Sequence, residues 1–275
     1  MIPAKFDYEV AKSVEHAVEL LGSSEDAKLL AGGHSLLPLM RLRFARPSTL
    51  VDIGRVPDLA YVREAGDRLE IGAMTRHHDL ANDPLLQSHC PLVSYTASGI
   101  GDPQVRHRGT IGGSVAHGDP ASDLPAVLLA LDAELVARGP DGERTIAAGD
   151  LFTGFLETTL GPQEVLTEIR VPKLAGVGWS YVKFARRAQD WATVGVAAVV
   201  NGRTAIALTN MGSTPLRATA VEEALAAGAD VAVAAESAAT GTDPPSDPGA
   251  SARYRRALAQ VLVRRAVEEA RSRAA

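Results

Sequence analysis

Two glycine pairs, each followed by a hydroxyl residue, are the features of this sequence best suited to binding an anion. The first lies in Ala31-Gly32-Gly33-His34-Ser35, after an apolar run that predicts a strand over residues 27–31. Ser35 is predicted to cap a helix that begins at Leu36. A residue without a Cβ atom lets a phosphate approach the backbone, and the amides at a helix start point toward it. The segment therefore predicts a phosphate site, although a plain tight turn explains this pair equally well.

A second pair of the same kind lies in Thr110-Ile111-Gly112-Gly113-Ser114. Two amide-rich turns that are distant in the sequence can hold the two ends of one diphosphate, and a dinucleotide such as FAD supplies that group. Neither turn is a P-loop, which needs a Gly-Lys-Ser/Thr ending. The Rossmann fingerprint also fails, because Gly99-Ile100-Gly101 is followed by Gln104 where the third glycine is required. The pair predicts a dinucleotide site without a common nucleotide motif.

The composition excludes several other classes of protein. The chain has 275 residues, a net charge of −5 and 4% aromatic residues, which argues against nucleic-acid binding. Cys90 is the single cysteine, so the chain holds neither an intrachain disulfide nor a cluster with four cysteine ligands. Its apolar neighbours predict a buried structural thiol. No apolar stretch approaches the ~20 residues that span a bilayer, and no signal peptide is evident, so we expect a cytoplasmic protein.

The secondary structure expected around the motifs is that of an α+β protein. Residues 1–57 are predicted to form a small α/β lobe around the first glycine pair, and residues 58–173 a second, α+β lobe around the second pair. Residues 174–275 are predicted to form a three-stranded antiparallel sheet and helices, the last helix over residues 251–273. Asn201-Gly202 predicts a hairpin within that sheet.

Several polar residues outside the motifs have a plain structural interpretation. Thr75 is predicted to cap a short helix, and Asp123 to cap another. His77 and His78 face different sides of a helix, which favours a surface role over a metal pair. Three arginines follow the first motif and are interpreted as a solvated helix end, with attraction of a diphosphate as the alternative: Arg41, Arg43 and Arg46.

The paired motifs, with Asp119-Pro120-Ala121-Ser122-Asp123-Leu124-Pro125 behind them, resemble the flavin-binding medium subunit of molybdenum hydroxylases. This is the family of aerobic carbon monoxide dehydrogenase and xanthine dehydrogenase, and the resemblance covers nearly the whole chain. It implies an FAD-binding domain of the p-cresol-methylhydroxylase type over residues 1–173 and a C-terminal flavoprotein domain over residues 174–275. The second motif often ends in Asn in the family. Here it ends in Ser114, which can still donate a hydrogen bond, so we expect FAD binding to survive.

The resemblance also implies which residues contact FAD. Asp123 is placed near the ribose or the diphosphate, and Ile100, Leu166 and Ile169 along the pocket. Lys183 matches a flavin-proximal lysine, whereas its strand context alone predicts a lysine that faces water. Trp191 falls where some relatives have a tyrosine beside the isoalloxazine ring, and filling of the core is the competing explanation. The predicted set is Leu30, Ala31, Gly32, Gly33, His34, Ser35, Leu36, Leu37, Ile100, Thr110, Ile111, Gly112, Gly113, Ser114, Asp123, Leu166, Ile169, Lys183 and Trp191.

The function implied by the resemblance is electron transfer within a multi-subunit enzyme, often a heterotrimer. A molybdopterin-binding large subunit would oxidise the substrate, and electrons would pass through a [2Fe–2S] small subunit to the FAD on this chain and then to an external acceptor. No catalytic base or metal ligand is expected on this chain. One alternative is a self-contained FAD oxidase or dehydrogenase of a small alcohol or amine, and another is a flavin-free assembly paralogue.

Overall fold

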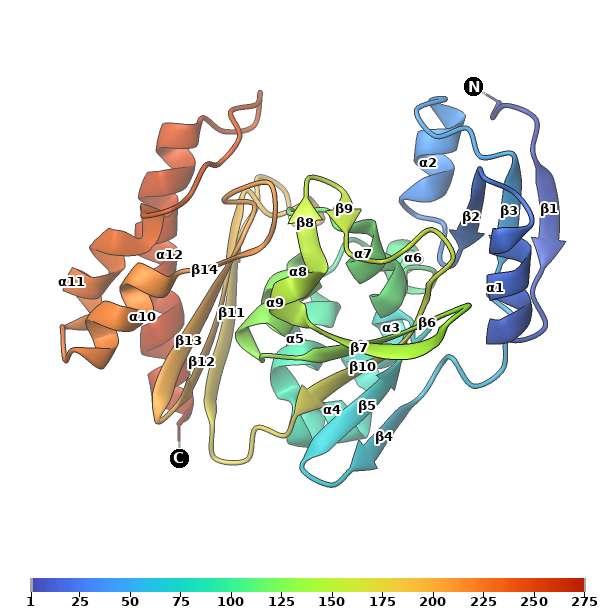
Figure 1. Ribbon diagram of the computed structural model, residues 1–275. Helices are drawn as coiled ribbons and strands as arrows, with labels where there is room; N and C mark the ends of the chain where they lie inside the picture. The colour runs from blue at the N-terminus through green and yellow to red at the C-terminus, as the bar shows by residue number, and fades with distance from the viewer. Residues whose placement is uncertain (1, 275) are drawn as a thin grey trace.

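The computed structural model describes residues 2–274 and has three main sheets, which follow one another across the molecule in chain order (Figure 1). The first sheet is parallel, with strand order β1-β3-β2. Ser13 caps the first helix by accepting a hydrogen bond from the N–H of His16, and that helix packs its apolar side on the sheet. The elements of this part are β1 (Asp7–Val10), α1 (Val14–Gly22), β2 (Ala27–Leu30), α2 (Leu36–Arg41) and β3 (Thr49–Asp52).

The second sheet is antiparallel, with strand order β4-β5-β10-β6-β7. Its strands are β4 (Val62–Ala65), β5 (Arg68–Gly72), β6 (Glu134–Gly139), β7 (Gly142–Ala147) and β10 (Val165–Pro172). Between β5 and β6 the chain forms α3 (His77–Asn82), α4 (Pro84–His89), α5 (Pro91–Ser98), α6 (Pro103–Arg106), α7 (Ile111–His117) and α8 (Asp123–Ala130). Between β7 and β10 lie α9 (Ala148–Leu151) and the small hairpin of β8 (Phe152–Gly154) and β9 (Glu157–Thr158).

The third sheet is antiparallel and follows the chain order β11-β12-β13-β14. The three predicted strands are present, and Asn201 pairs with Arg203 across Gly202 as the hairpin prediction requires. A fourth strand of two residues was not predicted. The elements are β11 (Gly178–Phe184), β12 (Val194–Asn201), β13 (Arg203–Thr209), β14 (Leu216–Arg217), α10 (Thr219–Ala226), α11 (Val231–Ala235), η1 (Glu236–Ala239) and α12 (Ala252–Arg273).

Both faces of the third sheet are buried, and this places the sheet beside α8. Val196 and Ile206 pack on the side of α12, whereas Ala197 and Ala207 belong to the same apolar cluster as α8. Side chains that alternate between the two faces explain the nearly continuous apolar sequence of β12. Every residue of α8 is buried. The two clusters therefore connect the third sheet to the helix that carries Asp123.

Several predictions about local structure are corrected. Thr75 caps no helix, because its hydroxyl bonds with the backbone of Tyr61 and α3 begins two residues later. Ser35 occupies the N-cap position of α2 but its side chain makes no capping hydrogen bond. Asp123 lies in the first turn of α8, after Ser122 at the N-cap. His77 is buried and not on the surface.

Two further properties follow from the packing and the helix lengths. Cys90 is buried, as predicted, and burial raises the pKa of its thiol to about 12, so the thiol stays protonated at neutral pH. Among residues 2–274, no helix is both long enough and apolar enough to cross a membrane.

Candidate functional site

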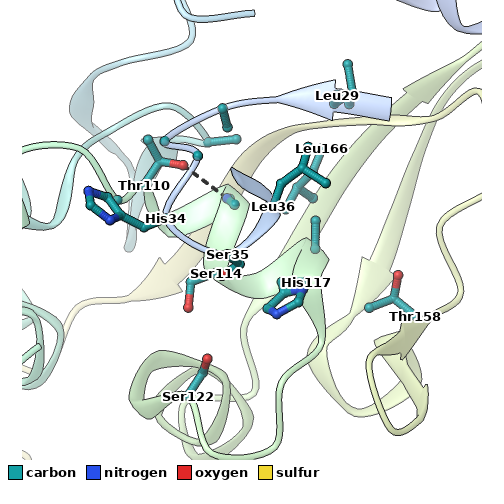
Figure 2. Close-up of a pocket in the computed structure, with 18 of the residues that line it drawn as sticks. Leu29, His34, Ser35, Leu36, Thr110, Ser114, His117, Ser122, Thr158 and Leu166 are labelled. Carbon is teal, nitrogen blue, oxygen red and sulfur yellow. Dashed lines mark hydrogen bonds between the residues drawn. The ribbon is translucent and has the colours of Figure 1, made fainter. Parts of the chain in front are cut away.

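An open cleft of about 880 Å³ is lined by residues of β2, of α7, of the β8–β9 hairpin and of β11. Figure 2 shows the loop of His34 and Ser35 beside α7, with Ser114, His117 and Ser122 along the same cleft. Most of the residues predicted from the sequence line it: Ala31, Gly32, Gly33, His34, Ser35, Leu36, Ile100, Thr110, Gly112, Gly113, Ser114, Asp123, Leu166, Lys183 and Trp191. Residues from all three parts of the chain therefore meet at one site.

The two glycine motifs are in direct contact. A Cβ atom on Gly32 would lie 2.2 Å from the carbonyl oxygen of Arg108 and 2.9 Å from the Cα atom of Gly109. A Cβ atom on Gly113 would lie 3.6 Å from the Cβ atom of Ala31. Because real Cβ atoms do not approach backbone this closely, Gly32 is required for the two segments to touch. The sequence prediction that the motifs converge is confirmed at the level of the backbone.

The first motif offers unpaired backbone donors to the cleft. Within the part of the chain that the structure describes, the N–H groups of Gly32, Gly33, His34 and Ser35 donate to no protein acceptor. Gly33 has a φ of +81°, a left-handed conformation that favours glycine. Because an anion can accept hydrogen bonds from consecutive amides arranged in such a turn, this loop has the chemistry of a phosphate site.

The second motif differs, and the prediction of a second set of free amides is wrong. Thr110 caps α7, and its Oγ1 accepts a hydrogen bond from the N–H of Gly113 (Figure 2). The N–H groups of Ile111 and Gly112 donate to the carbonyls of Thr75 and Ala73 at 3.0 and 2.8 Å. A Cβ on Gly112 would lie 2.6 Å from that of Ala73, so this glycine serves the packing of α7. The motif instead offers hydroxyl groups to the cleft.

A buried polar cluster links α8 to the third sheet at the edge of the cleft. Lys183 Nζ lies 2.7 Å from Oδ2 of Asp123, and the hydroxyl of Tyr181 donates to Oδ1 at 2.6 Å. Asp123 is 6% exposed, and burial raises the pKa of its carboxyl, while Lys183 and both hydrogen bonds oppose that shift. The strand context of Lys183 predicted a lysine that faces water. This prediction is wrong, because the side chain is largely buried beside Asp123. Tyr181 was missed, although it precedes Lys183 by two positions and so shares its face of β11.

Four of the predicted residues do not line the cleft. Ile111 and Ile169 are fully buried in the core, and Leu37 is 40% exposed. Leu30 is half-buried and is not part of the lining either, whereas its neighbour Leu29 is. Successive side chains of a strand point to opposite faces, which explains why Leu29 of β2 lines the cleft and Leu30 does not. On β10, Ile169 lies further along the strand than Leu166 and packs entirely into the core.

Trp191 lies at the edge of the cleft, on the loop between β11 and β12. Its side chain is 58% exposed, so the competing interpretation of a core-filling residue is wrong. Gln189 and Asp190 of the same loop also line the cleft and were not predicted. The indole is thus free to contact a molecule bound in the cleft.

His77 is a further cleft residue that the sequence did not identify, and it gives a testable pH effect. Burial is the main cause that lowers its pKa to about 4, and nearby positive charge adds to this. Its Nδ1 has no hydrogen-bond partner in the described structure. Since the unfolded chain binds a proton near pH 6.5 and the folded chain does not, stability is lost as the pH falls from about 6.5 to about 4.

We therefore expect the free energy of unfolding of His77→Gln to fall less than that of the parent chain as the pH is lowered from about 6.5 to about 4. The loss attributable to His77 is up to about 3 kcal/mol across that range, from the size of the pKa shift. Urea unfolding at pH 7 and at pH 5 measures it. The matched control is His107→Gln at an exposed histidine. Its free energy of unfolding should depend on pH as that of the parent chain does. An unchanged slope in His77→Gln would contradict the expectation.

Contacting glycine motifs, free amides and a long cleft define a class of protein that holds an extended dinucleotide through its diphosphate. Comparison with known families gives the particular family. The family described as FAD binding domain in molybdopterin dehydrogenase matches residues 4–174, and the CO dehydrogenase flavoprotein C-terminal domain matches residues 179–270. The chain belongs to this family of molybdopterin dehydrogenase FAD-binding subunits, as its resemblance implied.

Similar proteins agree over the full length of the chain. It is 47% identical to the carbon monoxide dehydrogenase medium chain of Hydrogenophaga pseudoflava, over 100% of both chains. It is 42% identical to the 6-hydroxypseudooxynicotine dehydrogenase complex subunit alpha of Paenarthrobacter nicotinovorans, over 100% of this chain and 97% of that one. Among solved structures, it matches carbon monoxide dehydrogenase from Hydrogenophaga pseudoflava with a TM-score of 0.97, 48% identity and full coverage of both chains.

A more distant structure has the same fold. Quinoline 2-oxidoreductase from Pseudomonas putida 86 matches with a TM-score of 0.94 at 30% identity, over 100% of both chains. The predicted α+β fold, FAD as cofactor and a role as an oxidoreductase subunit are thereby confirmed. The comparisons support the medium subunit of a molybdenum hydroxylase and not a self-contained oxidase.

Proposed function

We propose that this chain is the electron-transfer subunit of a cytoplasmic molybdenum hydroxylase. A small subunit with [2Fe–2S] clusters delivers electrons to FAD held here, and a large molybdopterin-binding subunit oxidises the substrate. The two relatives named above are a medium chain and a complex subunit, which supports a multi-subunit assembly. The single cysteine also supports it, because a cluster with four cysteine ligands needs another chain.

The observation that carries the proposal is the contact between the two glycine motifs. The free amides of Gly32 to Ser35 face the same cleft as the hydroxyl-bearing start of α7, and Gly32 admits the close approach. These residues fit a diphosphate, since consecutive N–H donors and two hydroxyls supply the hydrogen bonds that such an anion needs. We assign the diphosphate to Gly32–Leu36, with Thr110 and Ser114 on the opposite side.

The ring systems of FAD are assigned to the parts of the cleft on either side of the diphosphate site. Leu29, Ile100 and Leu166 offer apolar walls, which suits aromatic rings. Lys183 is assigned to the flavin end. Asp123 is assigned there with it, and not to the ribose or the diphosphate as the resemblance implied, because the Lys183 ammonium lies 2.7 Å from its carboxylate. Trp191 shields that end from water. When bound, FAD supplies the redox chemistry, whereas the chain supplies binding, orientation and electrostatics.

We also propose the division of the chain into an FAD-binding domain over residues 1–173, with lobes of about 1–57 and 58–173, and a C-terminal flavoprotein domain over residues 174–275. The first two sheets and the third sheet fall on either side of this division. The Asp123–Lys183 ion pair crosses it. The flavin site is therefore completed by the C-terminal part, and residues 1–173 alone should bind FAD more weakly than the full chain.

Purification of the full chain tests the proposed function. We expect visible flavin absorbance, about one FAD per chain by extraction, and no oxidation of small alcohols or amines by the isolated chain. Co-expression with a large molybdopterin subunit and a small iron–sulfur subunit should yield a stable complex. A colourless chain that FAD cannot reconstitute would refute the proposal, and turnover by the isolated chain would favour the self-contained oxidase.

A further inference from the structure

The loop between β11 and β12 presents Trp191 at the cleft, and its two ends are held together. The N–H of Thr193 donates to the carbonyl of Phe184 at 2.8 Å, which closes the loop at its base. At the apex, Arg187 is 84% exposed and Trp191 is 58% exposed. The hydrogen bonds given for the apex join its own residues, since Arg187 pairs with Asp190 at 3.0 Å and the N–H of Asp190 donates to the carbonyl of Arg187. The position of Trp191 therefore depends on where the base of the loop is fixed.

Asn210 fixes the base from the side of the FAD cleft. It follows β13 in a left-handed conformation, with a φ of +61°, which asparagine tolerates better than most residues. Its side-chain Nδ2 donates to the carbonyl of Ala192 at 2.8 Å, and its backbone N–H donates to the carbonyl of Pro120, also at 2.8 Å. Pro120 belongs to the segment between α7 and α8. One residue therefore joins the end of the Trp191 loop to the wall of the cleft.

Arg255 fixes the same base from the side of α12. It is 2% exposed, and its guanidinium donates to the carbonyls of Thr193 and Pro245 while pairing with the carboxylate of Asp247. A buried guanidinium with three partners is costly to rearrange, so these contacts define one position of the loop. The neighbouring Tyr254 adds an edge-on contact to the ring of Phe184, with centroids 6.3 Å apart.

We propose that Asn210 and Arg255 are positioning residues, which hold the loop of residues 185–193 so that Trp191 stays against the flavin end of the cleft. Neither side chain lines the cleft, so both act through the loop. This inference rests on the proposed function in one respect, namely that the flavin ring lies near Lys183 and Trp191. The anchoring of the loop does not depend on FAD and can be measured without it.

The test compares Asn210→Gly and Arg255→Lys with the parent full-length chain. Glycine adopts the left-handed conformation and keeps the backbone bond to Pro120, so Asn210→Gly removes only the side-chain bond to Ala192. Hydrogen exchange of the two hydrogen-bonded amides of the loop, those of Asp190 and Thr193, should accelerate by roughly two- to tenfold, the effect of losing one hydrogen bond. The matched controls are Asn201→Gly on the exposed hairpin and Arg253→Lys on the exposed face of α12, and neither should change this exchange.

In the FAD-loaded chain, both variants should retain FAD and show stronger flavin fluorescence, approaching that of Trp191→Phe, because the indole no longer contacts the ring. Trp191→Phe combined with Asn210→Gly should not exceed the fluorescence of Trp191→Phe alone, which a general loss of structure would not reproduce. Exchange identical to the parent in both variants would overturn the anchoring. Faster exchange with unchanged flavin fluorescence would overturn the link to the flavin. A failure of the parent chain to bind FAD would instead refute the proposed function and leave the exchange result valid. If Arg255→Lys does not fold, Asn210→Gly decides the matter.

Discussion

Replacing Gly32 with alanine is expected to give a folded chain that is purified without visible flavin. The added Cβ atom would lie 2.2 Å from the carbonyl oxygen of Arg108 and 2.9 Å from both its carbonyl carbon and the Cα atom of Gly109, and these three backbone atoms cannot rotate away. The loop of residues 32–36 must therefore move away from α7. If the diphosphate loses two charge-assisted hydrogen bonds of about 1.5–3 kcal/mol each, the affinity for FAD falls by roughly 10²- to 10⁴-fold.

The measurement is the dissociation constant of FAD, obtained by titrating the flavin-free chain and following flavin fluorescence. Gly149→Ala is the matched control, because a Cβ atom there meets only Leu129 at 3.9 Å, an ordinary van der Waals distance. Its affinity should equal that of the parent chain. Circular dichroism must show that both variants are folded. Parent-like affinity in folded Gly32→Ala would mean that the contact between the two motifs is not needed to bind FAD.

Local sequence signals predicted the parts of this protein that depend on neighbouring residues. The amphipathic stretch over residues 251–273 predicted α12 almost to the residue. Asn201-Gly202 predicted the hairpin of β12 and β13, because the left-handed conformation of this turn favours Gly. The glycine pairs also revealed the cleft. In each case the residues that determine the structure lie within a few positions of one another.

Tertiary partners account for the errors. Thr75 is a residue type that often caps helices, but its hydroxyl is hydrogen-bonded to the backbone of Tyr61, fourteen positions earlier. Asp123 is also a residue type that often caps helices, but here its carboxylate accepts hydrogen bonds from Tyr181 and Lys183 of the third sheet. The free N–H groups expected at α7 are used by the carbonyls of Ala73 and Thr75. A single sequence shows which face of an element a side chain occupies, and not which element meets that face.

The pair of Asp123 and Lys183 shows how strongly such a tertiary partner acts. Lys183→Met is expected to lower the free energy of unfolding by about 3–5 kcal/mol, because it leaves the buried carboxylate of Asp123 without its counter-ion. Asp123→Asn combined with Lys183→Met removes both charges and should recover most of that loss. Lys173→Met is the matched control. Its ion pair with Glu64 is equally short, at 2.6 Å, but Glu64 is exposed, so the loss should stay within about 1 kcal/mol.

The loss in Lys183→Met should also depend on pH in a defined direction. Burial already raises the pKa of Asp123, and removal of the nearby positive charge raises it further. The folded chain therefore binds the proton of Asp123 more tightly than the unfolded chain does. Stability contributed by this group is fully present below the unfolded pKa and is lost as the pH rises through the folded pKa. Asp123→Asn, Lys183→Met lacks the carboxylate and so lacks this dependence.

Urea unfolding of the two variants at a series of pH values, without flavin so that ligand binding does not contribute, measures the effect. The gap between Lys183→Met and Asp123→Asn, Lys183→Met should be small in acid and widen toward neutral pH. A gap of constant size would show that Asp123 does not change its charge in this range and that the loss comes from packing of the lysine stem. A widening gap would show that Lys183 holds the buried carboxylate of Asp123 in its charged form at the edge of the cleft.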